Sequence, residues 1–253
     1  MLGLGVGPLI AGLLAQYAPW PLRLCYIVFL ALVVPTAVLI WMSHEPLDNR
    51  ASLSNASVRP RLGVPPEIRA QFISPGIAAF ITFSVLGFYT ALLPSLLAQS
   101  LQINDHAVAG IIVAGLFFVG TGTVGFTGKL KSWTGMLLSL ILFVPSLALL
   151  VWAEAARSMW ILLAGTAVTG VAAGFGYRFS LQVVNEIAPE NRRSEVVSCY
   201  LIACYCGISL PVIGIGLVSR ASSVFVADAI FAVFISILAV LALAFQLKIS
   251  PEK

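Results

Sequence analysis

Long apolar runs with few charged residues constrain this chain more than any other feature. A transmembrane helix needs about 20 mostly apolar residues to cross roughly 30 Å of hydrocarbon. The sequence holds eight such runs, at residues 2–18, 22–42, 73–98, 107–128, 135–153, 158–184, 196–219 and 224–247. They do not alternate apolar and polar residues as the strands of a membrane barrel do. The sequence therefore predicts an all-α membrane protein with eight transmembrane helices.

The composition supports the same class. Of the 253 residues, 60% are hydrophobic and 9% are charged, whereas a soluble domain carries about 25% charged residues. A soluble globule is therefore excluded, and so is a disordered chain, because the apolar content is too high. The basic residues are scattered between apolar runs and form no stripe, so we expect the lipid bilayer and no nucleic acid as a partner.

Lysine and arginine residues gather on one side of the predicted spans. Alternate connections lie on the same side of a membrane, and the cytoplasmic side is enriched in these residues. One side holds ten of them and the other holds three. The ten are Arg50, Arg59, Arg61, Arg69, Lys129, Lys131, Arg192, Arg193, Lys248 and Lys253, and the three are Arg23, Arg157 and Arg220. We expect a multi-pass protein of the bacterial inner membrane whose C-terminus and long central loop are cytoplasmic.

One connection, residues 43–72, is much longer than the others. Its Ser, Pro and charged residues are typical of a flexible linker, and we expect the piece 66–72 to form a short interfacial helix. The linker divides the chain into a helix pair at 1–42, the linker itself at 43–72 and a block of six helices at 73–253.

The chain also begins abruptly, because Met1 is followed at once by apolar sequence without the basic segment of a signal peptide. The first run resembles a helix cut near its start, which predicts missing upstream sequence.

The first apolar run carries small residues in a specific order, Gly3-Leu-Gly-Val-Gly7-Pro8-Leu-Ile-Ala11-Gly12. Small residues let another membrane helix approach closely, and Pro8 removes a backbone hydrogen bond and kinks the helix. The order resembles the antiporter motif in the fifth helix of the major facilitator superfamily, which ends in Gly-x-x-x-Gly-Pro-x-x-Gly-Gly. Gly3, Gly7, Pro8 and Gly12 match that motif, and Ala11 replaces one glycine.

Other features are similar to the same family. If the first run is the fifth helix, seven more should follow in a twelve-helix member, and seven do. The long linker then falls after the sixth helix, where the family has its central loop. The segment 188–194 resembles the turn after the family's tenth helix, and Pro211-Val-Ile-Gly echoes Pro8-Leu-Ile-Ala, as the family's symmetry between helices five and eleven implies. The resemblance covers the whole chain and implies a major facilitator-like bundle equivalent to helices five to twelve.

One segment departs from the family's pattern. Members often carry an acidic and Arg-rich loop in the first half of the fold, with a looser copy between helices eight and nine. Here that second position, residues 125–135, lacks the acid and the arginines. The resemblance therefore does not extend to the gating salt bridge that the family often builds there.

The resemblance also implies where a substrate would bind. Such transporters consist of two six-helix bundles that rock about a central site, and helices one, four, seven and ten line the cavity. This chain supplies the last two, as its third and sixth runs. We expect the chain to need the missing N-terminal helices of the same protein and to have no transport activity alone.

Polar and aromatic residues on the third and sixth runs are the candidates for substrate contact. Apolar and aromatic walls with few polar groups suit small amphipathic molecules. The candidates are Thr82, Phe83, Tyr89, Thr90, Thr166 and Gly170. The alternative for all of them is ordinary packing between helices.

Two ionisable residues inside spans complete the candidate set. Charges within a membrane are costly and often functional. Arg178 shares a helix face with Gly170, Gly174 and Gln182 and is either a cavity residue, a residue that snorkels to the interface or a structural donor at the inner gate. Asp228 is a candidate for proton coupling, with an interfacial or capping acid as the alternative.

The remaining motifs point away from catalysis. The four cysteines lie within apolar runs, the two histidines lie in loops, and neither type has metal-ligand spacing. The sequence contains no phosphate-binding Gly-Lys-Ser/Thr motif and no nucleophile–base set. We therefore expect no cofactor, no metal and no enzyme activity.

The sequence thus predicts a truncated secondary active transporter that exports a small organic molecule or drug against the entry of protons. Two alternatives stay open. One is an importer of a small metabolite within the same family. The other is a non-transporting membrane scaffold that arises from a truncated gene.

Overall fold

The computed structural model describes residues 2–43, 63–128 and 130–249, and within these ranges the chain forms helices and turns only. The interval 44–62 lies outside the described residues, and with it Arg50, Arg59 and Arg61 of the orientation argument. The helices are α1 (Leu2–Tyr17), α2 (Pro21–Met42), η2 (Pro66–Ile68), α3 (Arg69–Ala91), α4 (Leu93–Gln99), α5 (His106–Phe126), α6 (Ser132–Ala155), α7 (Met159–Ile187), η3 (Glu190–Arg192), α8 (Arg193–Ala221) and α9 (Val224–Ile249).

Each of the eight predicted apolar runs is helical, so the all-α membrane class is confirmed. Seven helices in the described part of the chain are long and apolar enough to cross a membrane. The eighth, α1, has 16 residues, which at 1.5 Å per residue is about 24 Å and short of the roughly 30 Å hydrocarbon thickness.

The third predicted span is broken near one end. The run predicted at 73–98 forms α3, which stops at Ala91, and the short helix α4, which begins at Leu93. Pro94 accounts for the break, because it has no N–H to donate to the carbonyl of Thr90 and its ring crowds that carbonyl.

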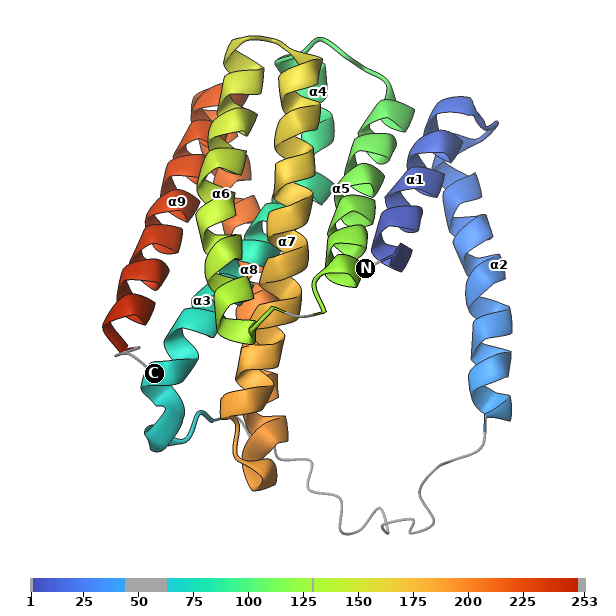
Figure 1. Cartoon of the computed structure of the whole chain (residues 1–253). Coiled ribbons are helices and arrows are strands. Elements are labelled where there is room, and N and C mark those ends of the chain that lie inside the picture. Colours follow the sequence, from blue (N-terminus) through green and yellow to red (C-terminus); the bar gives the residue numbers. More distant parts are fainter. Residues whose placement is uncertain (1, 44–62, 129, 250–253) are drawn as a thin grey trace.

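The helices from α3 onward form one packed bundle. Helix α3 contacts α7, α8 and α9, while α7 also packs on α5 and α6, and α9 closes the bundle against α6. Figure 1 shows α1 beside α5, with α2 set apart at the edge of the molecule. No residue in the most apolar stretch of α2 is buried. The face of α2 that points away from α1 is therefore exposed within the described structure.

Consecutive connections lie at opposite ends of the bundle, as the charge pattern requires. The ends of α2, α5 and α7 and the starts of α3, α6 and α8 lie at one end, which we call the linker end (Figure 1). The turns from α1 to α2 and from α6 to α7 lie at the other, which we call the far end (Figure 1). Which end faces the cytoplasm stays a prediction from the basic residues.

Candidate functional site

A cluster of three hydroxyl groups joins α3 to α7. The Tyr89 hydroxyl oxygen lies 3.4 Å from Oγ1 of Thr166 and 3.4 Å from Oγ1 of Thr169. Both threonines donate to carbonyls of their own helix at 2.8 Å, which leaves their oxygens free to accept from Tyr89. All three side chains are buried. The structure therefore brings together two predicted candidates, Tyr89 and Thr166, and adds Thr169.

The next two candidates on α3 fill the same helix–helix contact nearer the linker end. Thr82 packs directly on Gly176 of α7, where a side chain at position 176 would collide with its hydroxyl. The Phe83 ring meets the Tyr177 ring edge-on, with their centroids 6.0 Å apart. Both residues thus pack α3 on α7 in this conformation.

Thr90 is the candidate that reaches open space. It lines a cavity of about 260 Å³ between α1, the end of α3 and α5. Its hydroxyl donates to the Leu86 carbonyl at 2.9 Å and to the Gly87 carbonyl at 3.2 Å, so its lone pairs stay free to accept. The lining residues are Pro8, Ala11, Gly12, Ala15, Thr90, Pro94, His106, Ala109, Gly110 and Val113.

The Gly-rich face of α1 packs against α5 with backbone on backbone. A Cβ atom added to Gly12 would lie 2.6 Å from the His106 carbonyl oxygen, and one added to Gly110 would lie 2.6 Å from the Pro8 carbonyl oxygen. A Cβ atom added to Gly3 or to Gly7 would have no atom of another element within 4 Å. Of the four motif residues, Gly12 and Pro8 therefore contact α5 in the described structure, while Gly3 and Gly7 face away from it. A third residue on the contact face is Gly5, beside Phe117 and Phe118.

Gly170 lies in a second close helix contact rather than at a cavity wall. A Cβ atom there would lie 2.7 Å from the Leu116 carbonyl oxygen of α5. One turn later Gly174 meets Gly120 of α5, where an added Cβ atom would lie 3.0 Å from the Gly120 Cα atom. The small residues that the sequence places in steps of four along α7 thus form its packing face toward α5.

Arg178 continues that face and acts on the end of α5. Its Nη1 atom donates to the Val124 carbonyl and lies 3.4 Å from Oγ1 of Thr127, while the guanidinium carbon lies 5.3 Å from the Phe179 ring centroid. The last four carbonyls of a helix lack intrahelical partners and carry partial negative charge. Arg178 therefore caps α5, which is the structural role that the sequence left open beside a cavity role.

Asp228 lies at the far end, one turn into α9, where it is 1% exposed. Its neighbour there is Glu154 of α6, whose carboxyl group lies within hydrogen-bonding reach of it. Ser100 donates to Oε1 of Glu154 at 2.9 Å. Asp228 is thus remote along the bundle from Arg178, as their positions in the spans predict, and it has an acidic partner.

Sequence reasoning missed Glu154 and Thr169. The fifth predicted span ends at 153, two residues before the end of α6, so Glu154 was placed in a connection rather than in a span. A rule that flags any acid within the last turn of an apolar run would have found it. Thr169 lies three residues after Thr166 on the same helix face, and this spacing was the available signal.

The described residues contain no group of three or more His, Cys, Asp or Glu side chains that could hold a metal ion. The second loop motif, predicted at 125–135, includes Lys129, which lies outside the described residues.

Comparison with known proteins places these features in context. Residues 77–250 match the family model described as Sugar (and other) transporter. The fold is similar to the crystal structure of a bacterial homologue of the human lysosomal transporter Spinster, in an inward-facing and unoccupied conformation, with a TM-score of 0.52 and 16% identity. The match covers 92% of this chain and 61% of that one, so this chain spans less than two thirds of the relative's length. No curated protein matches the chain.

Proposed function

We propose, from the premise that this chain belongs to the major facilitator superfamily of membrane transporters, that it forms part of a secondary active transporter that exports a small amphipathic organic molecule. The observation that carries the proposal is the hydroxyl cluster of Tyr89, Thr166 and Thr169, which sits in otherwise apolar surroundings between α3 and α7. Hydroxyl groups in an apolar wall hydrogen-bond a neutral or weakly polar molecule without demanding a charge on it.

The cavity beside Thr90 supports the same assignment. It opens between α1 and the α3–α5 side of the bundle, along the boundary between the predicted parts 1–42 and 73–253. In a rocking mechanism the substrate binds between two bundles. We therefore assign Thr90 to substrate contact at this cavity, and Tyr89 to substrate contact through the hydroxyl cluster. We assign Thr82 and Phe83 to the packing of α3 on α7, Gly170 to the packing of α7 on α5, and Arg178 to the cap of α5.

The contact between α1 and α5 suits an interface at which two helices move relative to each other during transport. At Gly12 and Gly110 the two helix backbones lie directly against each other, so few interdigitated side chains would have to separate when the helices tilt. We propose that α1 and α2 belong to an N-terminal bundle and that the six helices from α3 onward form the C-terminal one. The linker end is cytoplasmic in this proposal, because ten of the basic residues used for orientation lie on that side.

Efflux coupled to proton entry is the proposed driving mode. The motif residues Gly3, Gly7, Pro8 and Gly12 resemble the antiporter motif. Asp228 is the coupling candidate, since it is a buried carboxyl group within hydrogen-bonding reach of a second one, that of Glu154. Direct drive by ATP has no support, because the sequence lacks a phosphate-binding motif.

A metabolite importer is the second candidate. The same three hydroxyl groups suit a polyol, since a sugar offers hydroxyl donors and acceptors that pair with them. The description of the matched family, which names sugar transport, favours testing this class.

The experiment is transport by the protein translated from its complete reading frame, reconstituted in liposomes. A panel of amphipathic drugs and a panel of sugars are followed with and without a proton gradient. We expect gradient-dependent export of at least one amphipathic compound and a several-fold higher KM for it in Tyr89→Phe. The matched control is Tyr26→Phe, because Tyr26 is exposed on α2.

Three results would count against the proposal. Transport that ignores the proton gradient would contradict antiport. Accumulation of a sugar, with no drug exported, would favour the importer. A folded protein that moves neither class would favour the membrane scaffold.

A further inference from the structure

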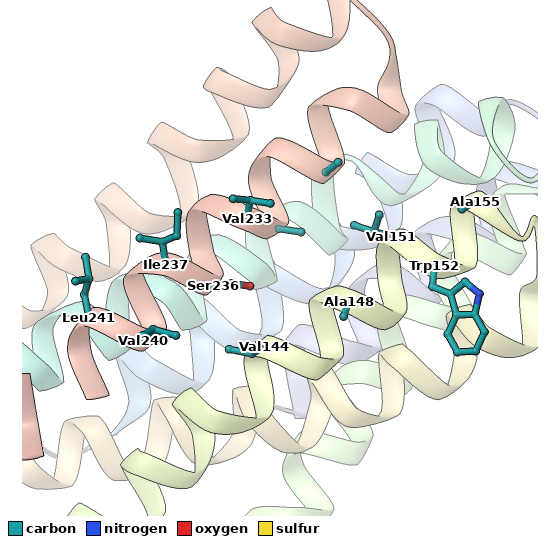
Figure 2. A pocket seen from close by; sticks show the side chains of 12 residues that line it. Val144, Ala148, Val151, Trp152, Ala155, Val233, Ser236, Ile237, Val240 and Leu241 are labelled. Carbon is teal, nitrogen blue, oxygen red and sulfur yellow. The ribbon is translucent and has the colours of Figure 1, made fainter. Parts of the chain in front are cut away.

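A long apolar groove runs between α6 and α9 on the outer surface of the bundle. Figure 2 shows the side chains that line it, from Trp152 and Ala155 at one end to Leu241 at the other. The groove has a volume of about 700 Å³, and its walls are almost wholly aliphatic. Val233, Ile237 and Leu241 are each more than half exposed. In a membrane-spanning chain such a surface meets lipid.

The groove has the length of one lipid leaflet. On α6 its lining runs from Val144 to Ala155, which at 1.5 Å per residue is about 17 Å. Half of a hydrocarbon core of about 30 Å is 15 Å. Trp152 lies near the end of the groove that is closer to the far end of the bundle, and tryptophan is enriched where hydrocarbon gives way to headgroups. The groove therefore spans from the middle of the membrane to one interface.

A polar pocket continues the groove at this interface. It has a volume of about 390 Å³, and Ala155 lines both the groove and the pocket. Its lining residues are Gln99, Ser100, Glu154, Ala155, Arg157, Ser223, Val224 and Phe225. The pocket thus presents one carboxyl group and one guanidinium group at the level where a lipid headgroup would lie. The other ionisable groups of nearby elements are Asp228 on α9, Arg220 at the end of α8, and Asp105 and His106 at the start of α5.

Two carboxyl oxygens beside the pocket lack a hydrogen-bond partner among the described residues. They are Oε2 of Glu154 and Oδ2 of Asp228, and the two side chains are 4% and 1% exposed. The Ser100 hydroxyl donates a hydrogen bond to the other oxygen of Glu154, Oε1. Buried carboxyl oxygens without donors are costly, so nearly all such groups in proteins have partners. Because the two carboxyl groups lie within hydrogen-bonding reach of each other, one shared proton can join these two oxygens. The pair then keeps one negative charge, which a cation with N–H donors in the pocket beside Glu154 would balance.

We propose that the groove and pocket together bind a phospholipid whose headgroup carries a primary ammonium, as phosphatidylethanolamine does. One acyl chain lies along the groove between α6 and α9. The phosphate pairs with Arg157, and the ammonium donates hydrogen bonds to Glu154. This lipid site lies on α6 and α9, away from the cavity beside Thr90, and it does not depend on the transported substrate.

The chemistry of the pocket selects against the other common headgroups. Phosphatidylcholine carries the same phosphate and charge, but its quaternary nitrogen has no N–H to donate. Phosphatidylglycerol can pair with Arg157 yet brings no cation to the carboxyl groups. An ammonium has three donors, and charge-assisted hydrogen bonds are about twice as strong as neutral ones.

Trp152 provides a direct readout, because brominated acyl chains quench an indole that they touch. The full chain is prepared with Trp152 as its single tryptophan and reconstituted in vesicles in which one lipid is brominated. The four replaced residues are Trp20, Trp41, Trp133 and Trp160. We expect brominated phosphatidylethanolamine to bind the site about tenfold more tightly than brominated phosphatidylcholine, the ratio that one charge-assisted hydrogen bond provides.

Three variants assign the parts of the site. Glu154→Gln keeps the shape of the side chain, and we expect it to abolish the preference between the two lipids. Arg157→Gln should weaken the binding of both lipids equally, because both carry the phosphate. The matched control is Glu186→Gln, since Glu186 pairs with Ser132 at the linker end, and there the preference should persist.

A second measurement needs no variant. Successive N-methylation of phosphatidylethanolamine removes one N–H donor at a time, and affinity for the wild-type chain should fall with each step. Equal quenching by phosphatidylethanolamine and phosphatidylcholine would overturn the proposal, as would a preference that survives in Glu154→Gln. Absence of quenching by every brominated lipid would show that no acyl chain occupies the groove and would overturn it as well.

Discussion

Replacement of Gly12 by leucine should detach α1 and α2 from the rest of the bundle. In the described structure this helix pair is held to the bundle mainly by the packing of α1 on α5, with one added hydrogen bond from the His106 amide to Oε1 of Gln16 at 3.1 Å. A Cβ atom at Gly12 would lie 2.6 Å from the His106 carbonyl oxygen and 3.1 Å from the Gly110 Cα atom. These are backbone atoms, so no flexible side chain can move aside.

The size of the effect follows from that geometry. The helices must separate by about 0.8 Å before the 2.6 Å approach reaches ordinary van der Waals contact, and a gap of 0.5–1 Å forfeits about a quarter to a half of each dispersion contact. Overpacking of this kind costs about 1–3 kcal/mol. Leucine adds three more carbon atoms at a contact that already has no room for a Cβ atom. We therefore expect the association of the helix pair with the bundle to lose about 2–3 kcal/mol, which makes it roughly 30- to 140-fold weaker.

The assay separates the two parts after cleavage. A protease site is inserted into the interval 44–62, the purified chain is cut in detergent, and the fraction of the N-terminal fragment that stays with the C-terminal fragment is measured. The wild-type fragments should remain together, and those of Gly12→Leu should separate. Gly7→Leu is the matched control, because a Cβ atom added to Gly7 on the same helix would have no atom of another element within 4 Å.

Two outcomes would refute this reasoning. Fragments of Gly12→Leu that associate as tightly as wild type would show that the backbone contact does not hold α1 to α5. Equal loss of association in Gly7→Leu would show that the added side chain, and not the contact at Gly12, causes the separation.

Two further substitutions test the packing of α7. Arg178→Met should lower the thermal stability of the purified chain by the equivalent of about 1–3 kcal/mol, because the Val124 carbonyl loses a charged donor. Arg178→Lys should recover part of the loss. An unchanged melting temperature in Arg178→Met would contradict the proposed cap of α5. Gly174→Leu should destabilise the chain by about 1–3 kcal/mol, because the added side chain would collide with Gly120 of α5. Gly115→Leu should be near neutral in the same melting experiment, because a Cβ atom added to Gly115 of α5 would have no atom of another element within 4 Å.

The helix positions could be predicted closely from the sequence. The second run was predicted to end at 42 and α2 ends at Met42, and the eighth was predicted to begin at 224 and α9 begins at Val224. Transfer of a segment into lipid depends on the summed hydrophobicity of that segment, which is a local property. The break at Leu92 was not predicted, because whether a proline bends or ends a helix depends on the packing of the residues beyond it.

The candidate site could be predicted only in part. That Tyr89 and Thr166 meet rests on the order of helices that the family resemblance implies, and the structure places them 3.4 Å apart. Glu154 escaped notice because its role depends on Asp228 and Ser100, which come from two other helices distant in sequence. The choice among the alternatives for Arg178 needed the position of the end of α5, which no pattern within α7 contains.

The sequence alone therefore determined that the chain is apolar enough to cross a membrane repeatedly, approximately where each apolar run is helical, and which connections share a side. The tertiary structure decided which face of each helix meets a neighbour. The physical reason lies in the solvent. In water an apolar stripe marks the buried face of a helix, but lipid is as apolar as leucine, so both faces of a membrane helix look alike in sequence. Gly7 and Gly12 illustrate this, since they lie in one motif and only the second touches α5.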